Sequence, residues 1–77
     1  MSVKKLKSKP AWKKLGKKIR QIRKEQKISQ EQLAFESSLS REEIYRLELG
    51  YINPTYDTLD AIAEALNVQV KELVDFE

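Results

Sequence analysis

The sequence predicts an all-α fold, a compact bundle of five short helices. Apolar residues recur at spacings of three or four positions from Leu15 to Val74, and no run alternates as a half-buried strand does. Residues typical of helix starts and stops separate these runs at short intervals. With 77 residues, the chain has room for one small domain.

The first helix is expected from Pro10 to about Gln26. Proline suits the first turn of a helix because its missing N–H has no partner there in any case. One apolar stripe follows, formed by Trp12, Leu15, Ile19 and Ile22. Residues 1–9 hold four lysines and too little apolar surface to fold alone. We therefore expect a flexible basic arm over residues 1–9 and a folded domain over residues 10–77.

Two serines mark the second and third helices. The capping-box spacing, a serine followed three positions later by Gln or Glu, occurs at Ser29 and again at Ser40. It predicts one helix over residues 30–37 and another over residues 41–49. Gly50 is expected to end the third helix, because glycine accepts the left-handed conformation of a helix C-terminus.

The last two helices follow a loop that contains an Asn-Pro pair. Thr55 is expected to cap a fourth helix over residues 56–66, and Asn67 to take the left-handed position after it. A fifth helix is expected over residues 70–75. Gln69 is a poor capping residue, so this last helix is expected to fray.

The net charge of +3 hides a strong asymmetry along the chain. Residues 1–27 hold twelve Lys and Arg and one acidic residue, whereas residues 28–77 hold three basic and eleven acidic residues. A basic segment of this kind predicts a polyanionic partner. The alternative is a lysine-rich tail that only increases solubility.

Several function classes are disfavoured by what the sequence lacks. It has no Cys and no His, which excludes disulfides and Cys/His zinc sites, so we expect no metal and no cofactor. There are only two glycines, hence no glycine-rich phosphate loop, and the carboxylates are scattered, so we expect no enzymatic activity. The chain shows neither a long apolar segment nor a secretory signal, which favours a cytoplasmic protein that does not enter a membrane.

The segment from residue 29 to residue 50 resembles the helix-turn-helix of Cro/cI-type (XRE-type) DNA-binding domains. The matching fragments are Ser29-Gln30-Glu31-Gln32-Leu33-Ala34, Leu39-Ser40-Arg41, Ile44-Tyr45-Arg46-Leu47-Glu48-Leu49-Gly50, Asn53-Pro54-Thr55, Thr58-Leu59, Ile62-Ala63, Ala65-Leu66-Asn67-Val68 and Glu72-Leu73. The resemblance covers about residues 15–75 and implies a lambda-repressor-like fold. It also implies a sequence-specific, double-stranded DNA-binding transcription regulator that acts by operator occupancy, as small phage repressors and restriction–modification controller proteins do. Because no sensor domain is present, no small-molecule ligand is expected.

The resemblance also implies roles for particular residues. The base contacts it implies are Arg41, Glu42, Tyr45 and Arg46. The phosphate contacts are Gln30 and Ser40, to which we add Lys17 and Lys18 from the basic first helix. Arg23 and Glu48 match a structural ion pair. Arginine suits O6 and N7 of guanine, and glutamate can accept a hydrogen bond from N4 of cytosine. Ser38 stands where the family usually has glycine, at a cost of about 1 kcal/mol if its φ is positive.

One such domain reads too few base pairs to select a genomic site, so we expect a homodimer on a palindromic operator. The candidate dimer interface is Val68, Val70, Val74 and Phe76; alternatively, these residues only close the bundle.

Two other functions stay open. The acidic residues of the third helix favour a protein-interaction module, antitoxin-like or coactivator-like. The basic first helix could attach to a membrane surface, although the core needs its apolar stripe.

Overall fold

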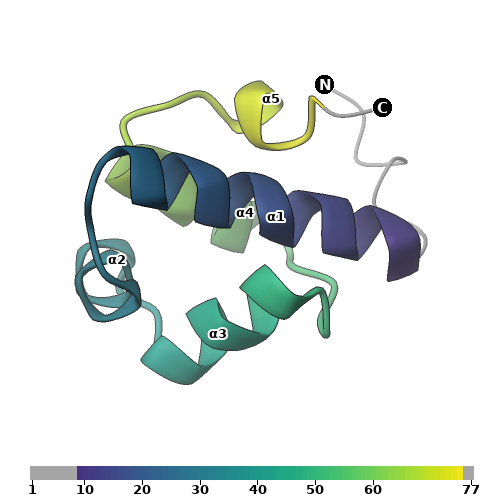
Figure 1. The fold of residues 1–77 in the computed structure, drawn as a ribbon, viewed down its shortest axis with the longest axis horizontal. Helices are drawn as coiled ribbons and strands as arrows, with labels where there is room; N and C mark the ends of the chain where they lie inside the picture. Colours follow the sequence, from purple (N-terminus) through teal and green to yellow (C-terminus); the bar gives the residue numbers. More distant parts are fainter. Residues whose placement is uncertain (1–8, 76–77) are drawn as a thin grey trace.

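Five helices follow one another along the chain in the computed structural model, which describes residues 9–75 (Figure 1). They are α1 (Lys9–Glu25), α2 (Gln30–Ser37), α3 (Arg41–Leu49), α4 (Tyr56–Ala65) and α5 (Val70–Leu73). The described part of the chain contains no strand, so the all-α, five-helix prediction is confirmed. Its helices are all too short or too polar to cross a membrane.

The predicted boundaries hold where capping signals are strong and shift where they are weak. Both α2 and α3 have the predicted ends. The fourth helix ends one residue early, at Ala65, and α5 ends at Leu73 instead of residue 75. Lys9, expected in the arm, is the first residue of α1, and the rest of the arm lies outside the described residues.

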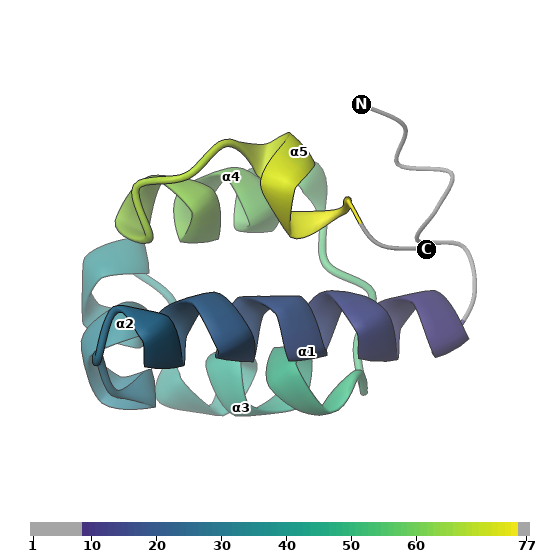
Figure 2. The ribbon, with the colours of Figure 1, turned by 45° about the horizontal axis from the view of Figure 1, so that its top comes forward.

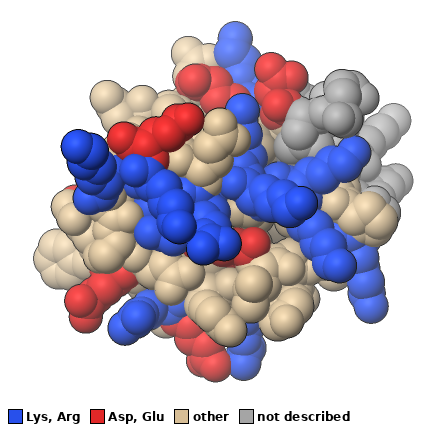
Figure 3. Space-filling view, viewed as in Figure 1, with Lys and Arg blue, Asp and Glu red and all other residues tan. Residues whose placement is uncertain are grey.

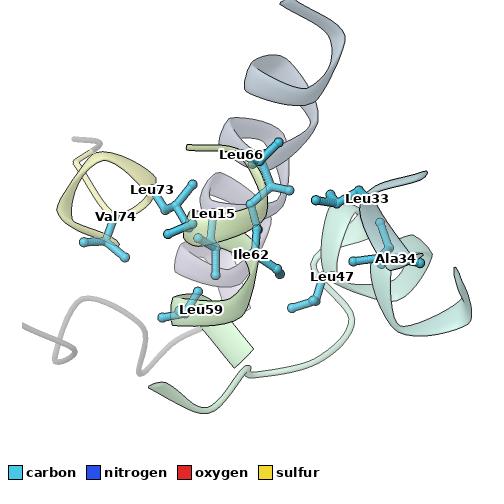
Figure 4. Packing of buried hydrophobic residues seen from close by; sticks show 12 residues of the cluster. Leu15, Leu33, Ala34, Leu47, Leu59, Ile62, Leu66, Leu73 and Val74 are labelled. Atoms are coloured by element: carbon cyan, nitrogen blue, oxygen red, sulfur yellow. The ribbon is translucent and has the colours of Figure 1, made fainter. Parts of the chain in front are cut away.

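The helices enclose one core, to which all five contribute buried side chains. Helix α1 packs along α3, α2 bridges α3 and α4, and α5 closes the bundle against α1 and α4 (Figures 1 and 2). Figure 4 shows Leu33 of α2 on one side and Leu73 of α5 on the other, with Leu15 and Ile62 between them. The fully buried large side chains are Leu15, Ile19, Leu33, Ile44, Leu47, Leu59, Ile62, Leu66 and Leu73. Each contributes about 1.5–3 kcal/mol through removal of its apolar surface from water.

Hydroxyl side chains cap three helices as the sequence predicts. Ser29 Oγ accepts a hydrogen bond from the backbone N–H of Gln32 at 3.0 Å, and Thr55 caps α4 in the same way. At Ser40 the full capping box forms, because Glu43 also accepts from the Ser40 backbone N–H. These local bonds satisfy N–H groups that a helix start otherwise leaves unpaired.

The turn between α2 and α3 carries backbone strain at Ser38. Its φ is 60° and its ψ 30°, the left-handed region that L-residues other than Asn and Asp seldom adopt.

We expect Ser38→Gly to raise the free energy of unfolding by about 0.5–1 kcal/mol. Denaturant unfolding measures this. Ser37→Gly is the matched control and should lower stability, because the buried Ser37 hydroxyl donates to the Leu33 carbonyl at 2.7 Å. A Ser38→Gly variant less stable than wild type would contradict this interpretation.

The proposed C-terminal dimer interface needs correction. Val74 is only 4% exposed and belongs to the core cluster, so it has almost no surface to offer a second copy. Val68 and Val70 are half-buried and pack against the same cluster, and Phe76 lies outside the described residues. A four-residue helix has to turn most of its apolar side chains inward to close the bundle, which explains the difference.

Candidate nucleic-acid interface

The α2–turn–α3 unit is held at a fixed angle by small residues and backbone hydrogen bonds. Ala34 is 5% exposed and lies where α2 approaches α3. The Leu39 backbone N–H donates to the Ala34 carbonyl at 3.0 Å, which closes the turn. Ile44 and Leu47 bury the inner face of α3, so the opposite face is free to contact a partner.

Helix α3 also approaches α1 very closely, and Gly16 makes this possible. A Cβ atom placed on Gly16 would lie 2.3 Å from the carbonyl oxygen of Leu47 and 2.5 Å from that of Glu48. Real Cβ atoms do not approach backbone oxygens so closely, so only glycine fits here. The C-terminal half of α3 is therefore held directly against α1.

An ion pair ties α1 to α3 beside this contact. Arg23 Nε and Nη2 donate to the two carboxylate oxygens of Glu48 at 2.6 and 2.9 Å. A third donor of Arg23, Nη1, donates to the Ile28 carbonyl at 2.9 Å, and Gln30 Nε2 donates to Glu48 Oε1 at 3.0 Å. Arg23 and Glu48 are 8% and 7% exposed. The structure thus brings together the two residues that the resemblance paired, and adds Gln30 to them.

The electrostatics of this pair favour the charged state of Arg23. The hydrogen bond to Glu48 raises the pKa of Arg23, burial opposes the rise, and the Glu48 charge adds to it. Because the folded-state pKa of Arg23 lies above its ordinary value, the stabilisation is fully present at every pH below that ordinary value. No titration of Arg23 therefore occurs in the physiological range, and the pair acts as a permanent part of the scaffold.

The outward face of α3 presents the four predicted base-contacting residues together. Arg41, Glu42, Tyr45 and Arg46 are all exposed. Arg46 Nη2 donates to Glu42 Oε2 at 2.8 Å across one helical turn, with both side chains largely in solvent. Among residues 9–75, Arg41 makes no hydrogen bond or ion pair. This face therefore carries one uncompensated cation, at the start of α3.

A shallow hollow joins the α3 face to α1 and to the start of α2. It is lined by Arg20, Arg23, Ser29, Gln30, Glu31, Arg41, Tyr45, Glu48 and Leu49. The charges of Arg23 and Glu48 in the wall of the hollow neutralise each other. The remaining charged residues of the lining are the cations Arg20 and Arg41 and the anion Glu31. Backbone N–H groups of the α2 N-terminus lie at the same rim, which favours an anion there.

A basic ridge runs along α1 beside this hollow. We define it as Lys13, Lys17, Arg20 and Lys24, whose spacing of four, three and four places them on one helix face. Lys13 packs against Gly50 after α3, and Arg20 lines the hollow with α3 residues, so the ridge follows the α3 side of α1. Figure 3 shows Lys and Arg side chains gathered in a band over α1.

Comparison with known proteins identifies this arrangement. The sequence profile of the helix-turn-helix family matches residues 19–73, which hold α2, the turn, α3 and most of the core. The chain belongs to the helix-turn-helix family. The match of this helix-turn-helix chain to the family profile begins within α1 and extends through α4 to the end of α5.

Two curated relatives are similar in sequence. The control protein C.BamHI of Bacillus amyloliquefaciens is 47% identical over 62 residues, 79% of this chain and 76% of that protein. The immunity repressor protein of Bacillus phage phi105 is 43% identical over 60 residues, 78% of this chain. Those residues make up 42% of the phage protein, so the helix-turn-helix chain spans less than half of that relative.

Two solved structures share the helix-turn-helix fold. The restriction-modification controller protein C.AhdI from Aeromonas hydrophila superposes with a TM-score of 0.79 at 34% identity, over 80% of this chain and 94% of that one. The clp gene regulator ClgR from C. glutamicum gives a TM-score of 0.79 at 23% identity, over 83% of each chain. The second likeness shows the fold alone.

Two of the predicted phosphate contacts are not placed to make them. Ser40 uses its backbone N–H and its hydroxyl in the capping box, so the Glu43 carboxylate occupies the place where an anion would bind. Lys18 lies on the other side of α1 from Lys17, in a groove with Glu72 of α5 and with Asp75, which follows α5. Adjacent helix residues point about 100° apart, so the two lysines serve different faces of this helix-turn-helix domain.

Arg20 is a candidate that the sequence interpretation missed. It lines the hollow beside Gln30 and Arg41, whereas the predicted Lys18 does not. The signal was present in the spacing of Lys13, Lys17, Arg20 and Lys24, but many Lys and Arg surround this set on α1. Only the position of α3 shows which stripe belongs to the interface.

Proposed function

We propose that this protein binds double-stranded DNA at specific sequences, as a homodimer on a palindromic operator, and controls transcription by occupying that site in the cytoplasm. The chain is a DNA-binding transcription regulator of the helix-turn-helix family. Its proposed DNA-binding surface consists of the outward face of α3, the hollow and the basic ridge. The free Arg41 on an exposed helix, next to a row of cations, is the observation that carries the proposal.

The surface divides into parts with different tasks. The outward face of α3 enters the major groove, where Arg41, Glu42, Tyr45 and Arg46 reach base edges. The basic ridge lies beside α3 and contacts phosphates, which carry no sequence information but position the protein. Gln30 keeps one amide hydrogen for a phosphate, because the other is donated to Glu48.

The names of the relatives support regulation of transcription. One is named an immunity repressor, one a control protein and one a restriction-modification controller protein. Occupancy of an operator needs no catalytic group and no ligand. A palindrome with half-sites about 34 Å apart would let two copies double the number of base pairs that are read.

Arg41 provides the test of base recognition. Selection of bound duplexes from a random pool should first give an operator. On that operator, Arg41→Ala should weaken binding by about 1–3 kcal/mol and relax the preference at one base pair, as expected when a bidentate contact to guanine is lost. Equilibrium binding at fixed salt measures both effects.

Lys17→Ala is the matched control, since it also removes one exposed cation. It should weaken binding to operator and random duplexes alike and reduce the slope of log affinity against log salt by about 1. If Arg41→Ala lost equal affinity on operator and random DNA, Arg41 would be a phosphate contact instead. If no duplex were enriched from the pool, sequence-specific binding would be rejected.

A further inference from the structure

The outward part of α3 that is proposed to meet base edges carries no net charge. Residues 41–46 (Arg-Glu-Glu-Ile-Tyr-Arg), which we call the reading segment, hold two Arg and two Glu, so their charges cancel. The basic ridge on α1, by contrast, consists of four cations. Attraction to the phosphates of any duplex therefore comes mainly from the ridge, and the two carboxylates of the reading segment oppose it.

The two carboxylates are held in different ways. Glu43 turns back to the start of its own helix, where it accepts a hydrogen bond from the Ser40 backbone N–H at 3.0 Å. Glu42 instead accepts from Arg46 Nη2 at 2.8 Å, across one turn of the outward face. The Glu42 side chain is 69% exposed and that of Arg46 53%. Glu42 is therefore the carboxylate that meets base edges when α3 enters the major groove.

Glu42 and Arg46 form a stripe of their own on α3. Arg41 and Tyr45 line the hollow beside α1 and α2. Glu42 and Arg46 each follow one of these residues by one position, so they lie about 100° further round the helix. The reading segment thus has one side with the free cation of Arg41, and a second side on which the cation of Arg46 already holds a carboxylate.

The chemistry of the carboxylate limits the bases that it can meet. A carboxylate only accepts hydrogen bonds. In the major groove, N4 of cytosine and N6 of adenine donate, whereas O6 and N7 of guanine, O4 of thymine and N7 of adenine accept. Adenine N7 lies beside N6 and repels a carboxylate, so cytosine suits Glu42 best. At other bases Glu42 loses water without gaining a full partner, and it faces phosphates of its own sign.

We propose that Glu42, in its ion pair with Arg46, is a specificity-determining residue that selects against most DNA sequences. The inference rests on the proposed function and deepens it, because it says how non-cognate DNA is rejected. In water the exposed pair is weak, but the groove excludes water and strengthens it. Arg46 keeps further N–H groups for guanine while it holds Glu42, so the pair is favourable where guanine and cytosine are both within reach.

Glu42→Gln tests the proposal, since it removes the charge and keeps the size of the side chain. It should bind random duplexes about 10-fold more tightly than wild type, because a carboxylate no longer faces the phosphates. The ratio of operator to random affinity should fall about 10-fold or more, because the operator contact is lost at the same time. The gain on random DNA should shrink as salt rises. Equilibrium binding at two salt concentrations measures all three effects.

Glu43→Gln is the matched control. It removes the same charge one position further along, and glutamine also suits this position of a capping box. It should tighten binding to operator and random duplexes alike, so their ratio should stay that of wild type. A ratio unchanged in Glu42→Gln, or lowered as much in Glu43→Gln, would overturn the proposal. Thermal unfolding of all three proteins checks that they are folded.

Selection of bound duplexes gives an independent test from base identity. The wild type should require cytosine at one position of the operator half-site. Glu42→Gln should accept adenine there, because an amide can accept from N6 and donate to N7 of adenine. Identical preferences of the two proteins at every position would overturn the proposal.

The role of Arg46 is tested by a double-mutant cycle on the operator. Arg46→Gln alone leaves the Glu42 carboxylate unpaired in the groove. It should therefore cost about 3-fold more affinity, or more, than the same substitution made together with Glu42→Gln. Equal costs would mean that Glu42 acts without Arg46, contrary to the proposal.

The same experiments separate this inference from the function on which it rests. If the wild type enriched an operator but Glu42→Gln kept the wild-type ratio, sequence-specific binding would stand and only the role of Glu42 would fail. If the wild type enriched no duplex at all, the DNA-binding proposal would fail and this inference with it.

Discussion

Glu48→Ala is expected to lower the free energy of unfolding by about 3–5 kcal/mol, a large part of the stability of a domain of this size. The substitution removes the carboxylate partner of Arg23, a residue that is only 8% exposed in the folded protein. It also removes the acceptor of the Gln30 amide. Desolvation of an unpaired cation, more than the lost attraction itself, accounts for the size of the effect. Denaturant unfolding at neutral pH measures it.

Two controls separate burial from charge. Glu42→Ala also removes one partner of an ion pair, but the Arg46–Glu42 pair is exposed to solvent, so stability should change by at most about 0.5 kcal/mol. Replacing both buried partners, Arg23→Met with Glu48→Leu, should recover much of the stability because no charge is left unpaired. If Glu48→Ala cost no more than Glu42→Ala, the buried pair would not stabilise the fold.

Gly16→Ala should lower the free energy of unfolding by about 3 kcal/mol, as expected for overpacking at a tight contact. The new Cβ would lie 2.3 and 2.5 Å from two backbone oxygens of α3, and backbone cannot rotate aside as a side chain can. Helix propensity alone predicts the opposite sign, a gain of about 1 kcal/mol for replacing glycine by alanine within a helix. The direction of the change, measured by thermal or denaturant unfolding, therefore decides between the two effects.

Lys17→Ala is the control for this prediction. It introduces the same alanine at the next position of α1, where the side chain is exposed, and should change stability by no more than about 0.5 kcal/mol. A Gly16→Ala protein as stable as wild type would mean that α1 and α3 can separate at little cost. In that case, the position of α3 would not depend on this contact.

The groups that hold α3 in place and the groups proposed to read DNA are different residues. Gly16, Arg23 and Glu48 are buried behind α3, whereas Arg41 and Arg46 point into solvent. Substitutions on the outer face should therefore change the preferred operator without unfolding the domain. A rigid scaffold under an exposed reading surface also keeps the side chains in position for the major groove.

Local chemistry in the sequence determined most of the helix boundaries. Ser40 with Glu43 defines the start of α3, and the left-handed Gly50 ends it, because caps and turns depend on residues only a few positions apart. The same local signals predicted Asn67, and the family resemblance implied both the Ser38 turn and the pairing of Arg23 with Glu48. The left-handed Lys27 after α1 went unpredicted, since lysine carries no signal for it.

Only the tertiary structure decided which faces are available. The apolar spacing could not show that Val74 closes the core while Tyr51 and Tyr56 stay exposed, because amphipathic periodicity gives a face and not its neighbour. In the same way, Lys17 and Lys18 are equivalent in sequence, and the position of α3 assigns them to different surfaces. Gly16 had no local signal at all, since the atoms that require a glycine there belong to a helix about thirty residues further along the chain.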